Sequence, residues 1–459
     1  MRAPVATTCA YCGVGCGIVA TPGPRNGTGA REVAIVGDTS HPANRGRLCI
    51  KGTTLGDTVG LEGRLLHPMI GNRRASWDEA TRFVAKTFAD TMAEHGPDSV
   101  AFYVSGQLLT EDYYAANKLM KGFIGSGNID TNSRLCMASA VAAHNRAFGE
   151  DYVPVGYEDL EAADLIVLVG SNTAWCHPVV WQRIEAARAA RGARVVVVDP
   201  RRTETASEAD LHVQIGPDGD IPLFRALLAE MRNRGLVDEA FVAERCVVPD
   251  GFWANLDGAL DADLPDTFGV FADLVAAHPR MVTVFSMGAN QSVRGTDKGN
   301  VIINLHLATG RIGTVGAGPF SMTGQPNAMG GREVGGLASS LACHLGFSDV
   351  ERKAVAAFWD ADRLCAGPGL KAVDMFRAVD DGRIKAIWVM ATNPAVSMPD
   401  AGFVRGALEK CPFVVVSDCM ADTDTARLAH VRLPATGWGE KNGTVTNSER
   451  MVSRQRPFL

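Results

Sequence analysis

The sequence lacks any apolar segment long enough to cross a lipid bilayer. Its longest apolar runs, such as Leu165–Val169 and Val195–Val198, fall far short of the about 20 residues that a membrane-spanning helix needs. The N-terminus shows neither the hydrophobic region of a signal peptide nor a twin-arginine signal, since the pair Arg73-Arg74 lies too deep in the chain. We therefore expect a cytoplasmic protein that does not contact a membrane.

An excess of charge of either sign is also missing. The formal net charge is −6, and 21% of the 459 residues are charged while 46% are hydrophobic. These values are ordinary for a soluble protein with several cores. They argue against nucleic acid as a partner. The histidines are scattered and form no metal-ligand pair.

Short apolar runs that alternate with helical patterns predict an α/β fold with mostly parallel sheets. In residues 163–220 a strand, a helix and a second strand follow one another within about thirty residues, as in a βαβ unit. The alternation returns near the C-terminus, so we expect two α/β lobes. The predicted strands are Ser99–Val104, Asp164–Gly170, Arg194–Asp199, Asp210–Ile215, Met281–Met287, Lys385–Met390 and Phe413–Val416. The predicted helices are Asp78–His95, with Ser76 as N-cap and Glu79 at the capping-box position, and His177–Arg191.

Polar residues follow the strands of both predicted lobes. In open α/β sheets, ligands bind at the carboxyl ends of the strands. The segments at those ends are Gly170-Ser171-Asn172, Asp199-Pro200-Arg201, Thr392-Asn393-Pro394 and Ser417-Asp418. They suit nucleotide hydroxyls, phosphates and base edges, although any one of them could be an ordinary loop. No G-x-G-x-x-G or Walker A motif occurs at these turns, so the common NAD and ATP fingerprints are missing.

Four of the 11 cysteines form the strongest local signal. Cys9, Cys12 and Cys16 lie within eight residues, and Cys49 follows after a further 32. Glycines between and beside the first three let the backbone curl around one metal centre. This set suits a [4Fe–4S] cluster. A structural zinc site is the main alternative, but zinc sites usually pair two C-x2-C knuckles.

A redox C-x-x-C motif is a weaker alternative, because no thioredoxin-like pattern surrounds these cysteines. Residues 1–64 are rich in glycine and alternate turns with short strands at Gly17–Ala20 and Glu32–Val36. We interpret them as a small cluster-binding domain. Lys51 follows the last cysteine closely and is either a surface lysine or a bridge between the cluster and an anionic cofactor.

The strings CAYCGVGC and RGRLCIKG resemble the N-terminal domain of the molybdopterin oxidoreductase superfamily. TNSRLCMASAV, YEDLEAADLIVLVGSN, VVDPRRT, SMGANQS, GQPNAMGGREVG and ATNPAVSMP resemble prokaryotic, assimilatory-type nitrate reductases in order and spacing. The resemblance implies a [4Fe–4S] cluster and a molybdenum held by two molybdopterin guanine dinucleotides. Cys136 matches the position of the protein ligand to molybdenum, and a soft thiolate suits a sulfur-rich metal centre.

Residues near Cys136 favour nitrate as the substrate. Formate dehydrogenases resemble this region but usually have His directly after the metal ligand, where this sequence has Met137. Gln325 and Arg332 match positions lining the metal pocket in the family. A cationic Arg332 would attract nitrate; alternatively, it forms a salt bridge with Glu333 or another acid.

The resemblance also implies a set of cofactor contacts. They are Lys51, Gln107, Asn132, Gly170, Ser171, Asn172, Asp199, Arg201, Asp218, Asp220, Met287, Gln291, Asn393, Ser417, Asp418 and Lys441. Asp220 could instead begin a helix as its N-cap. The expected division is a cluster domain at 1–64, one α/β lobe at 65–105 with 319–459, and a second lobe with the molybdenum ligand at 106–318.

The resemblance therefore implies reduction of nitrate to nitrite, with a ferredoxin, a flavodoxin or an NADH-dependent reductase subunit as electron donor. A formate dehydrogenase-like enzyme and a non-catalytic electron-transfer subunit are the alternatives. Because the family's large subunits continue into a C-terminal β-barrel domain, we expect a fragment, a split subunit or a frameshifted product without that domain. The remaining cysteines are expected to be buried thiols: Cys176, Cys246, Cys343, Cys365, Cys411 and Cys419.

Overall fold

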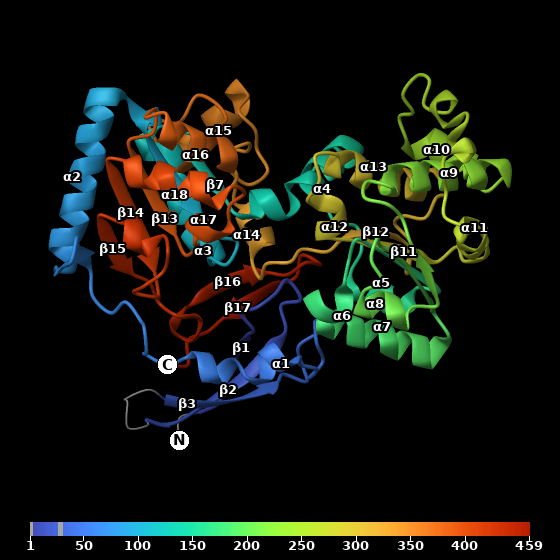
Figure 1. Cartoon of the computed structure of the whole chain (residues 1–459), viewed down its shortest axis with the longest axis horizontal. Helices are drawn as coiled ribbons and strands as arrows, with labels where there is room; N and C mark the ends of the chain where they lie inside the picture. Colours follow the sequence, from blue (N-terminus) through green and yellow to red (C-terminus); the bar gives the residue numbers. More distant parts are fainter. Residues whose placement is uncertain (1–2, 26–30) are drawn as a thin grey trace.

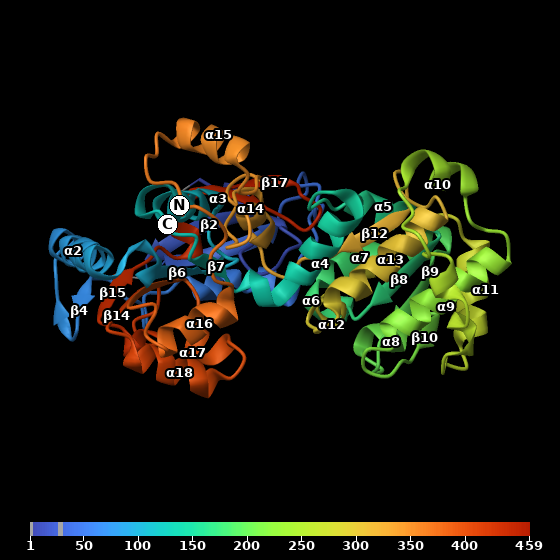
Figure 2. The same ribbon diagram turned by 90° about the horizontal axis from the view of Figure 1, so that it is seen from above.

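The computed structural model describes residues 3–25 and 31–459, which form two α/β lobes and a small N-terminal domain (Figure 1). Seen from above, the lobes lie side by side, with α4 (Ser133–Phe148) and α14 (Ala328–Glu333) between them (Figure 2). The predicted α/β fold with mostly parallel sheets is confirmed. No helix in the described ranges is long and apolar enough to cross a membrane.

The N-terminal domain is a three-stranded antiparallel sheet in the order β1-β2-β3. Its elements are β1 (Val5–Thr8), β2 (Gly17–Arg25), β3 (Arg31–Gly37), α1 (Ile50–Thr53) and the short helix η1 (Leu55–Thr58). Cys9 directly follows β1 and Cys16 directly precedes β2, so the pairing of these strands closes the loop that carries three cysteines. The backbone amide of Cys9 donates to the carbonyl of Cys16 at 2.8 Å. Both strands predicted in this domain are confirmed.

One lobe contains a five-stranded parallel sheet in the order β10-β9-β8-β11-β12. Its strands are β8 (Leu165–Val169), β9 (Arg194–Val198), β10 (Leu211–Val213), β11 (Met281–Phe285) and β12 (Gly318–Ser321). Its helices are α4, α5 (Tyr157–Ala162), α6 (Thr173–Cys176), α7 (Pro178–Arg191), α8 (Glu204–Glu208), α9 (Asp220–Asn233), α10 (Glu239–Arg245), α11 (Phe268–Ala277), α12 (Met287–Asn290) and α13 (Gly295–Ala308).

Helices cover both faces of this sheet, which explains why β8 is apolar throughout and why its neighbours are mostly apolar. Successive side chains of a strand point to opposite faces. Ile166 and Leu168 on β8 therefore share a core with Ile184 of α7, whereas Val167 packs in a second core with Phe224 of α9.

The other lobe contains a seven-stranded sheet in the order β5-β4-β15-β14-β13-β6-β7. Its strands are β4 (Met69–Ile70), β5 (Arg73–Arg74), β6 (Val100–Val104), β7 (Ile129–Thr131), β13 (Ala386–Met390), β14 (Phe413–Asp418) and β15 (Val431–Pro434). Its helices are α2 (Trp77–His95), α3 (Thr110–Asn117), the π-helix η3 (Lys118–Ile124), α14, α15 (Asp349–Trp359), α16 (Ala372–Asp380), α17 (Pro394–Ser397) and α18 (Ala401–Lys410). The two short strands β4 and β5 are antiparallel, and the other five are parallel.

The two sheets do not divide the chain after residues 105 and 318, where we expected the boundaries between the lobes. Strand β7, which we expected in the second lobe, pairs with β6 in the seven-stranded sheet. Consecutive strands usually lie next to each other in one sheet, and only α3 and η3 connect β6 to β7. Strand β12 begins at Gly318 and pairs with β11 in the five-stranded sheet.

The N-terminus of α2 differs in one detail from the prediction. The Ser76 hydroxyl accepts a hydrogen bond from the backbone amide of Glu79 at 3.1 Å, as expected of an N-cap. The carboxylate of Glu79 pairs with Arg73 instead of completing the capping box. An exposed cation on the preceding strand competes successfully for this carboxylate.

A C-terminal hairpin connects the N-terminal domain to the seven-stranded lobe. It consists of β16 (Gly443–Thr446) and β17 (Val452–Gln455), which pair antiparallel. The backbone amide of Arg456 donates to the Thr7 hydroxyl of β1 at 2.9 Å. Figure 1 shows the hairpin lying between the N-terminal sheet and the lobe that contains β13 and β14.

Candidate active site

The loop that carries Cys9, Cys12 and Cys16 packs against the segment that follows β12. The amide of Gly13 donates to the carbonyl of Gly324 at 2.9 Å. A Cβ at Gly13 would lie 2.2 Å from the carbonyl oxygen of Thr323, so only glycine allows this approach. The loop from Cys9 to Cys16, which we call the cluster loop, is thereby fixed against the segment that leads to Gln325.

The four predicted cluster cysteines lie close enough to influence one another. Burial, together with the charges of Cys12 and Cys49, raises the pKa of Cys9 to about 12, although a hydrogen bond from the Tyr11 backbone and the charge of Lys51 oppose this rise. Burial likewise raises the pKa of Cys12 and of Cys16. A metal centre would therefore be needed to keep them as thiolates.

Within the described ranges, no three His, Cys, Asp or Glu side chains converge on a single metal ion. Lys51 lies on α1, directly after the Cys49 turn, and its charge acts on both Cys9 and Cys12. The sequence interpretation of Lys51 as a neighbour of the cluster is consistent with this position.

Cys136 lies in the first turn of α4, facing the segment after β12. Burial raises the pKa of this thiol, whereas the backbone of Gly324 and the charge of Arg332 lower it. A Cβ at Gly324 would lie 2.9 Å from the methyl group of Met287 and 3.8 Å from the sulfur of Cys136. Because Gly324 has no side chain, the Cys136 thiol and the Met287 thioether border the same space beside it.

Met137 and Arg332 lie together beside Cys136. The Thr323 hydroxyl donates to the Met137 sulfur at 3.0 Å. Arg332 is 5% exposed, and its Nη1 atom contacts the sulfurs of Met137 at 3.5 Å and Met329 at 3.0 Å. Its Nε and Nη2 atoms donate to the two carboxylate oxygens of Asp151.

The alternative interpretation of Arg332, a salt bridge with Glu333 or another acid, is therefore confirmed, and the acid is Asp151. Burial alone would raise the pKa of Asp151, but the charge of Arg332 and the hydrogen bond from His144 hold it well below its usual value. Asp151 is ionised at neutral pH and fixes the plane of the guanidinium.

Gln325 and Asn132 connect the two lobes through side-chain hydrogen bonds. The Gln325 amide nitrogen donates to the Asn132 oxygen at 3.1 Å, and the Gln325 oxygen accepts from the Ser133 hydroxyl at 3.0 Å. The Asn132 amide nitrogen also donates to the Thr392 hydroxyl at 3.2 Å. Residues predicted on three separate segments thus lie around the start of α4.

The strand-end loops of the two lobes have matching geometry. Gly170 follows β8 with φ +54, and Ala391 follows β13 with φ +55. The Asn172 oxygen accepts from the hydroxyl of Thr205 at 2.7 Å and from its backbone amide at 3.4 Å. In the other lobe, the Asn393 oxygen accepts from the Thr425 hydroxyl at 2.6 Å and from its amide at 3.1 Å.

The match extends to the neighbouring residues. Asn172 and Asn393 each precede a short helix, α6 or α17. In the next strand of each lobe, Asp199 directly follows β9 and Asp418 ends β14. Each carboxylate accepts the backbone amide two residues later, at 3.0 and 2.9 Å. The sequence predicted these loops in both lobes, but it did not show that Thr205 and Thr425 complete each of them.

The remaining predicted contacts are more dispersed. Lys298 is buried and pairs with Asp218 and Asp220, each at 2.8 Å. Gly219, not Asp220, is the N-cap of α9. The other placements are as follows: Ser171 is buried and contacts Thr173, Gln291 donates to the Leu135 carbonyl, Ser417 accepts from Trp388, Lys441 is half-buried, and Gln107 and Arg201 are exposed.

Two buried side chains that the sequence interpretation missed lie on the same segments. Asn290 on α12 is 4% exposed, and neither its amide nitrogen nor its oxygen has a partner in the described structure. His177 precedes α7; its Nε2 atom contacts the Thr323 carbonyl at 2.8 Å and its Nδ1 atom has no partner among the described residues. Because unpaired buried polar groups are costly, these atoms fit a polar cofactor. Asn290 lies between Met287 and Gln291, two predicted cofactor contacts, and this position in the sequence could have indicated it.

The expectation that the other cysteines are buried was only partly correct. Cys365 and Cys411 are buried, whereas Cys176 and Cys343 are exposed and Cys246 and Cys419 are half-buried. Cys176 ends the short helix α6, and Cys343 lies in a tight turn with φ +48. Apolar neighbours in the sequence did not reveal that both positions turn outward.

Comparisons with known proteins agree with this arrangement. The molybdopterin oxidoreductase family profile matches residues 64–459, and the profile of the molybdopterin oxidoreductase Fe4S4 domain matches residues 3–60. The chain is 53% identical to a nitrate reductase of Klebsiella oxytoca, over 99% of this chain and 52% of that protein. It is also 53% identical to a nitrate reductase of Shewanella frigidimarina, over 99% of this chain and 50% of that protein.

The chain thus spans about half the length of these curated relatives. Among solved structures, acetylene hydratase from Pelobacter acetylenicus matches with a TM-score of 0.78 at 19% identity, over 98% of this chain and 66% of the other. At this sequence identity, the likeness shows a shared fold alone.

Proposed function

The chain belongs to the molybdopterin oxidoreductase family, and from this premise we propose that it serves in the reduction of nitrate to nitrite. The overall reaction consumes two electrons and two protons and releases nitrite and water. The relatives that are most similar among those described above are called nitrate reductases. Met137 beside Cys136 supports the same choice, since formate dehydrogenases usually have a histidine at that position.

The environment of the Arg332 guanidinium is the observation that carries the proposal. Its Nη1 atom contacts only the thioether sulfurs of Met137 and Met329 among the described residues. Thioethers are weak hydrogen-bond acceptors, so this donor retains most of its capacity for an anion. A nitrate oxygen would be a far better acceptor, and the planar guanidinium suits a planar oxyanion.

The neighbours of Arg332 keep this donor in place. Asp151 occupies the Nε and Nη2 atoms, which leaves Nη1 as the part of the guanidinium directed toward Cys136 and Met137. Gln325 adds a neutral amide at the start of α4. Together these groups would bind and orient a small anion beside the Cys136 thiol.

The proposed cofactor is molybdenum held by two molybdopterin guanine dinucleotides, with Cys136 as the protein ligand. When bound, it supplies two-electron oxygen-atom transfer. The matched loops at Asn172 and Asn393 support one dinucleotide for each lobe, because both present the same backbone turn and the same bound threonine. The five-stranded lobe would hold one dinucleotide and the seven-stranded lobe the other.

A [4Fe–4S] cluster held by Cys9, Cys12, Cys16 and Cys49 would supply one-electron transfer beside this site. Lys51 acts electrostatically on two of these thiols and would balance the charge between cluster and cofactor. We propose a ferredoxin, a flavodoxin or an NADH-dependent reductase subunit as electron donor, and the cytoplasm as the location.

Activity assays separate the proposed function from its closest alternative. Purified protein with reduced viologen and nitrate is expected to form nitrite, whereas formate with oxidised viologen is expected to give no dye reduction. Formate oxidation without nitrite formation would replace nitrate by formate as the substrate. Iron without molybdenum in the purified protein, with no turnover of either substrate, would favour an electron-transfer subunit.

A further inference from the structure

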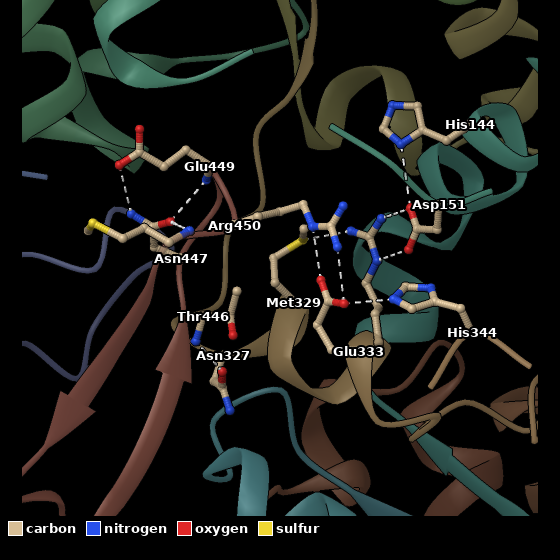
Figure 3. A network of polar contacts seen from close by, with 12 residues as sticks. His144, Asp151, Asn327, Met329, Glu333, His344, Thr446, Asn447, Glu449 and Arg450 are labelled. Carbon is tan, nitrogen blue, oxygen red and sulfur yellow. Dashed lines mark hydrogen bonds and ion pairs between the residues drawn. The ribbon is translucent and has the colours of Figure 1, made fainter. Parts of the chain in front are cut away.

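The segment Thr446–Arg450 consists of the last residue of β16 and the turn that follows it, and it lies between the cluster loop and α14. We call it the C-terminal turn. Thr446, Asn447 and Ser448 are at most 3% exposed, although the hairpin lies near the end of the described chain. Figure 3 shows its polar contacts together with those of Asp151 and His344. A buried polar turn in this place needs a specific set of partners.

One side of the C-terminal turn binds the cluster loop. The amide of Ser448 donates to the Gly13 carbonyl at 2.7 Å, and the Asn447 side chain donates to the Val14 carbonyl at 3.2 Å. A Cβ at Gly15 would lie 2.6 Å from the Cβ of Asn447, so the two segments are in tight contact. The turn therefore packs on the backbone between Cys12 and Cys16.

Its other side binds both ends of α14, the helix that carries Arg332. The amide of Thr446 donates to the side-chain oxygen of Asn327, the N-cap of α14, at 2.6 Å. Arg450 donates to both carboxylate oxygens of Glu333, the last residue of α14, at 3.0 and 3.2 Å. The C-terminal turn thus fixes the helix at its N-cap and at its last residue (Figure 3).

Two residues in this region have backbone conformations that side chains disfavour. Arg450 has φ +66 and His344, which also pairs with Glu333, has φ +64. Such conformations cost free energy and persist where surrounding contacts hold them, often at functional sites. Both strained residues contact the same carboxylate, next in sequence to Arg332.

From these contacts we infer that Arg450 is a positioning residue for anion binding. By fixing Glu333 it sets the orientation of Arg332, and through the rest of the C-terminal turn this orientation depends on the cluster loop. The inference rests on the proposed function, because it concerns the nitrate contact of Arg332. Arg450 itself does not reach Cys136 or Met137 in the described contacts.

The test compares Arg450→Met, Arg450→Lys and the control Arg454→Met in the purified protein. Arg454 lies on β17 of the same hairpin and donates to exposed Asn442. Arg450→Met is expected to raise KM for nitrate by about fivefold, a typical coupling effect, with kcat and iron content unchanged. Arg450→Lys, which keeps the charge, and Arg454→Met are expected to stay near the wild-type KM.

Hydrogen–deuterium exchange supplies a readout that does not depend on turnover. Amides of residues 328–333 are expected to exchange faster in Arg450→Met than in Arg454→Met. Equal KM and equal exchange in the two variants would overturn the inference, as would a parallel loss of kcat and iron in Arg450→Met. If the wild type reduces no nitrate, the proposed function fails. Faster amide exchange in Arg450→Met would then support only the structural contact between the C-terminal turn and α14.

Discussion

Arg332 and Asp151 form a buried bidentate ion pair although 181 residues separate them in the sequence. The guanidinium lies on α14 and the carboxylate lies beyond α4, so the pair connects the helices that lie between the two lobes. It leaves one nitrogen of Arg332 against two thioethers. The same pair therefore supports both the stability of the inter-lobe region and the proposed anion site.

Replacing Asp151 by Asn is expected to destabilise the protein by about 3 kcal/mol, because a buried guanidinium loses its partner. Urea denaturation followed by tryptophan fluorescence measures this change. The control is Glu158→Gln, which removes an acid paired with Arg45 where the side chains are 80% and 44% exposed; the change there should stay below about 0.5 kcal/mol. Equal effects of the two substitutions would contradict a buried pair.

The ion pair between His344 and Glu333 predicts a pH dependence of stability. The hydrogen bond with Glu333 raises the pKa of His344, and burial opposes this rise. The pair's contribution is therefore complete below the ordinary value of 6.5 and is lost as the pH rises through the raised pKa. The charged neighbours Asp151 and Arg450 act on the same imidazole, in opposite directions.

Measured from pH 6 to 9, the stability difference between wild type and His344→Gln should shrink as the pH rises. Because both side chains are partly exposed, the difference at low pH should be about 1 kcal/mol or less. A difference that grows with pH, or that is constant over this range, would show that His344 is not held as a cation by Glu333.

Loss of a cluster cysteine should remove iron. In Cys49→Ser the protein is expected to lose its visible iron–sulfur absorbance and most of its iron, since a hydroxyl is a poor replacement for the thiolate. Metal analysis and the absorbance spectrum measure this. Cys246→Ser, at a half-buried cysteine away from the site, is expected to keep both. Retention of full iron content in Cys49→Ser would remove Cys49 from the ligand set.

The matched loops predict that each lobe holds one nucleotide. Asn172→Ala removes the hydrogen-bond acceptor of Thr205, and Asn393→Ala removes that of Thr425. Each variant should therefore release less guanine nucleotide per molybdenum than the wild type, for which the proposal requires two. Asn442→Ala, at an exposed residue, is the control. A wild-type ratio of one would contradict a bis-dinucleotide cofactor.

The sequence was sufficient to predict the strands and helices that form because of their own local residue pattern. Apolar runs such as Leu165–Val169 are buried on both faces, and their composition shows it without further context. The loops that follow these strands were predictable for the same reason. The partner of Arg332 was not predictable. Asp151 lies in a loop without a regular residue pattern, and nothing in the sequence relates it to Arg332.

Other features of the site depend equally on distant contacts. Thr205 and Thr425 complete the strand-end loops only once the chain has returned to the same sheet edge. The buried, unpaired amide of Asn290 is visible only from its surroundings. Strand β7 joins the seven-stranded sheet through its pairing with β6, which periodicity alone does not assign.

The central claim is that nitrate is reduced at a centre held by Cys136. Nitrite formation with reduced viologen, compared between wild type, Cys136→Ser and the exposed-cysteine control Cys343→Ser at equal iron content, tests it most directly. The account predicts nitrite from the wild type and from Cys343→Ser, and essentially none from Cys136→Ser. Undiminished nitrite formation by Cys136→Ser would contradict it.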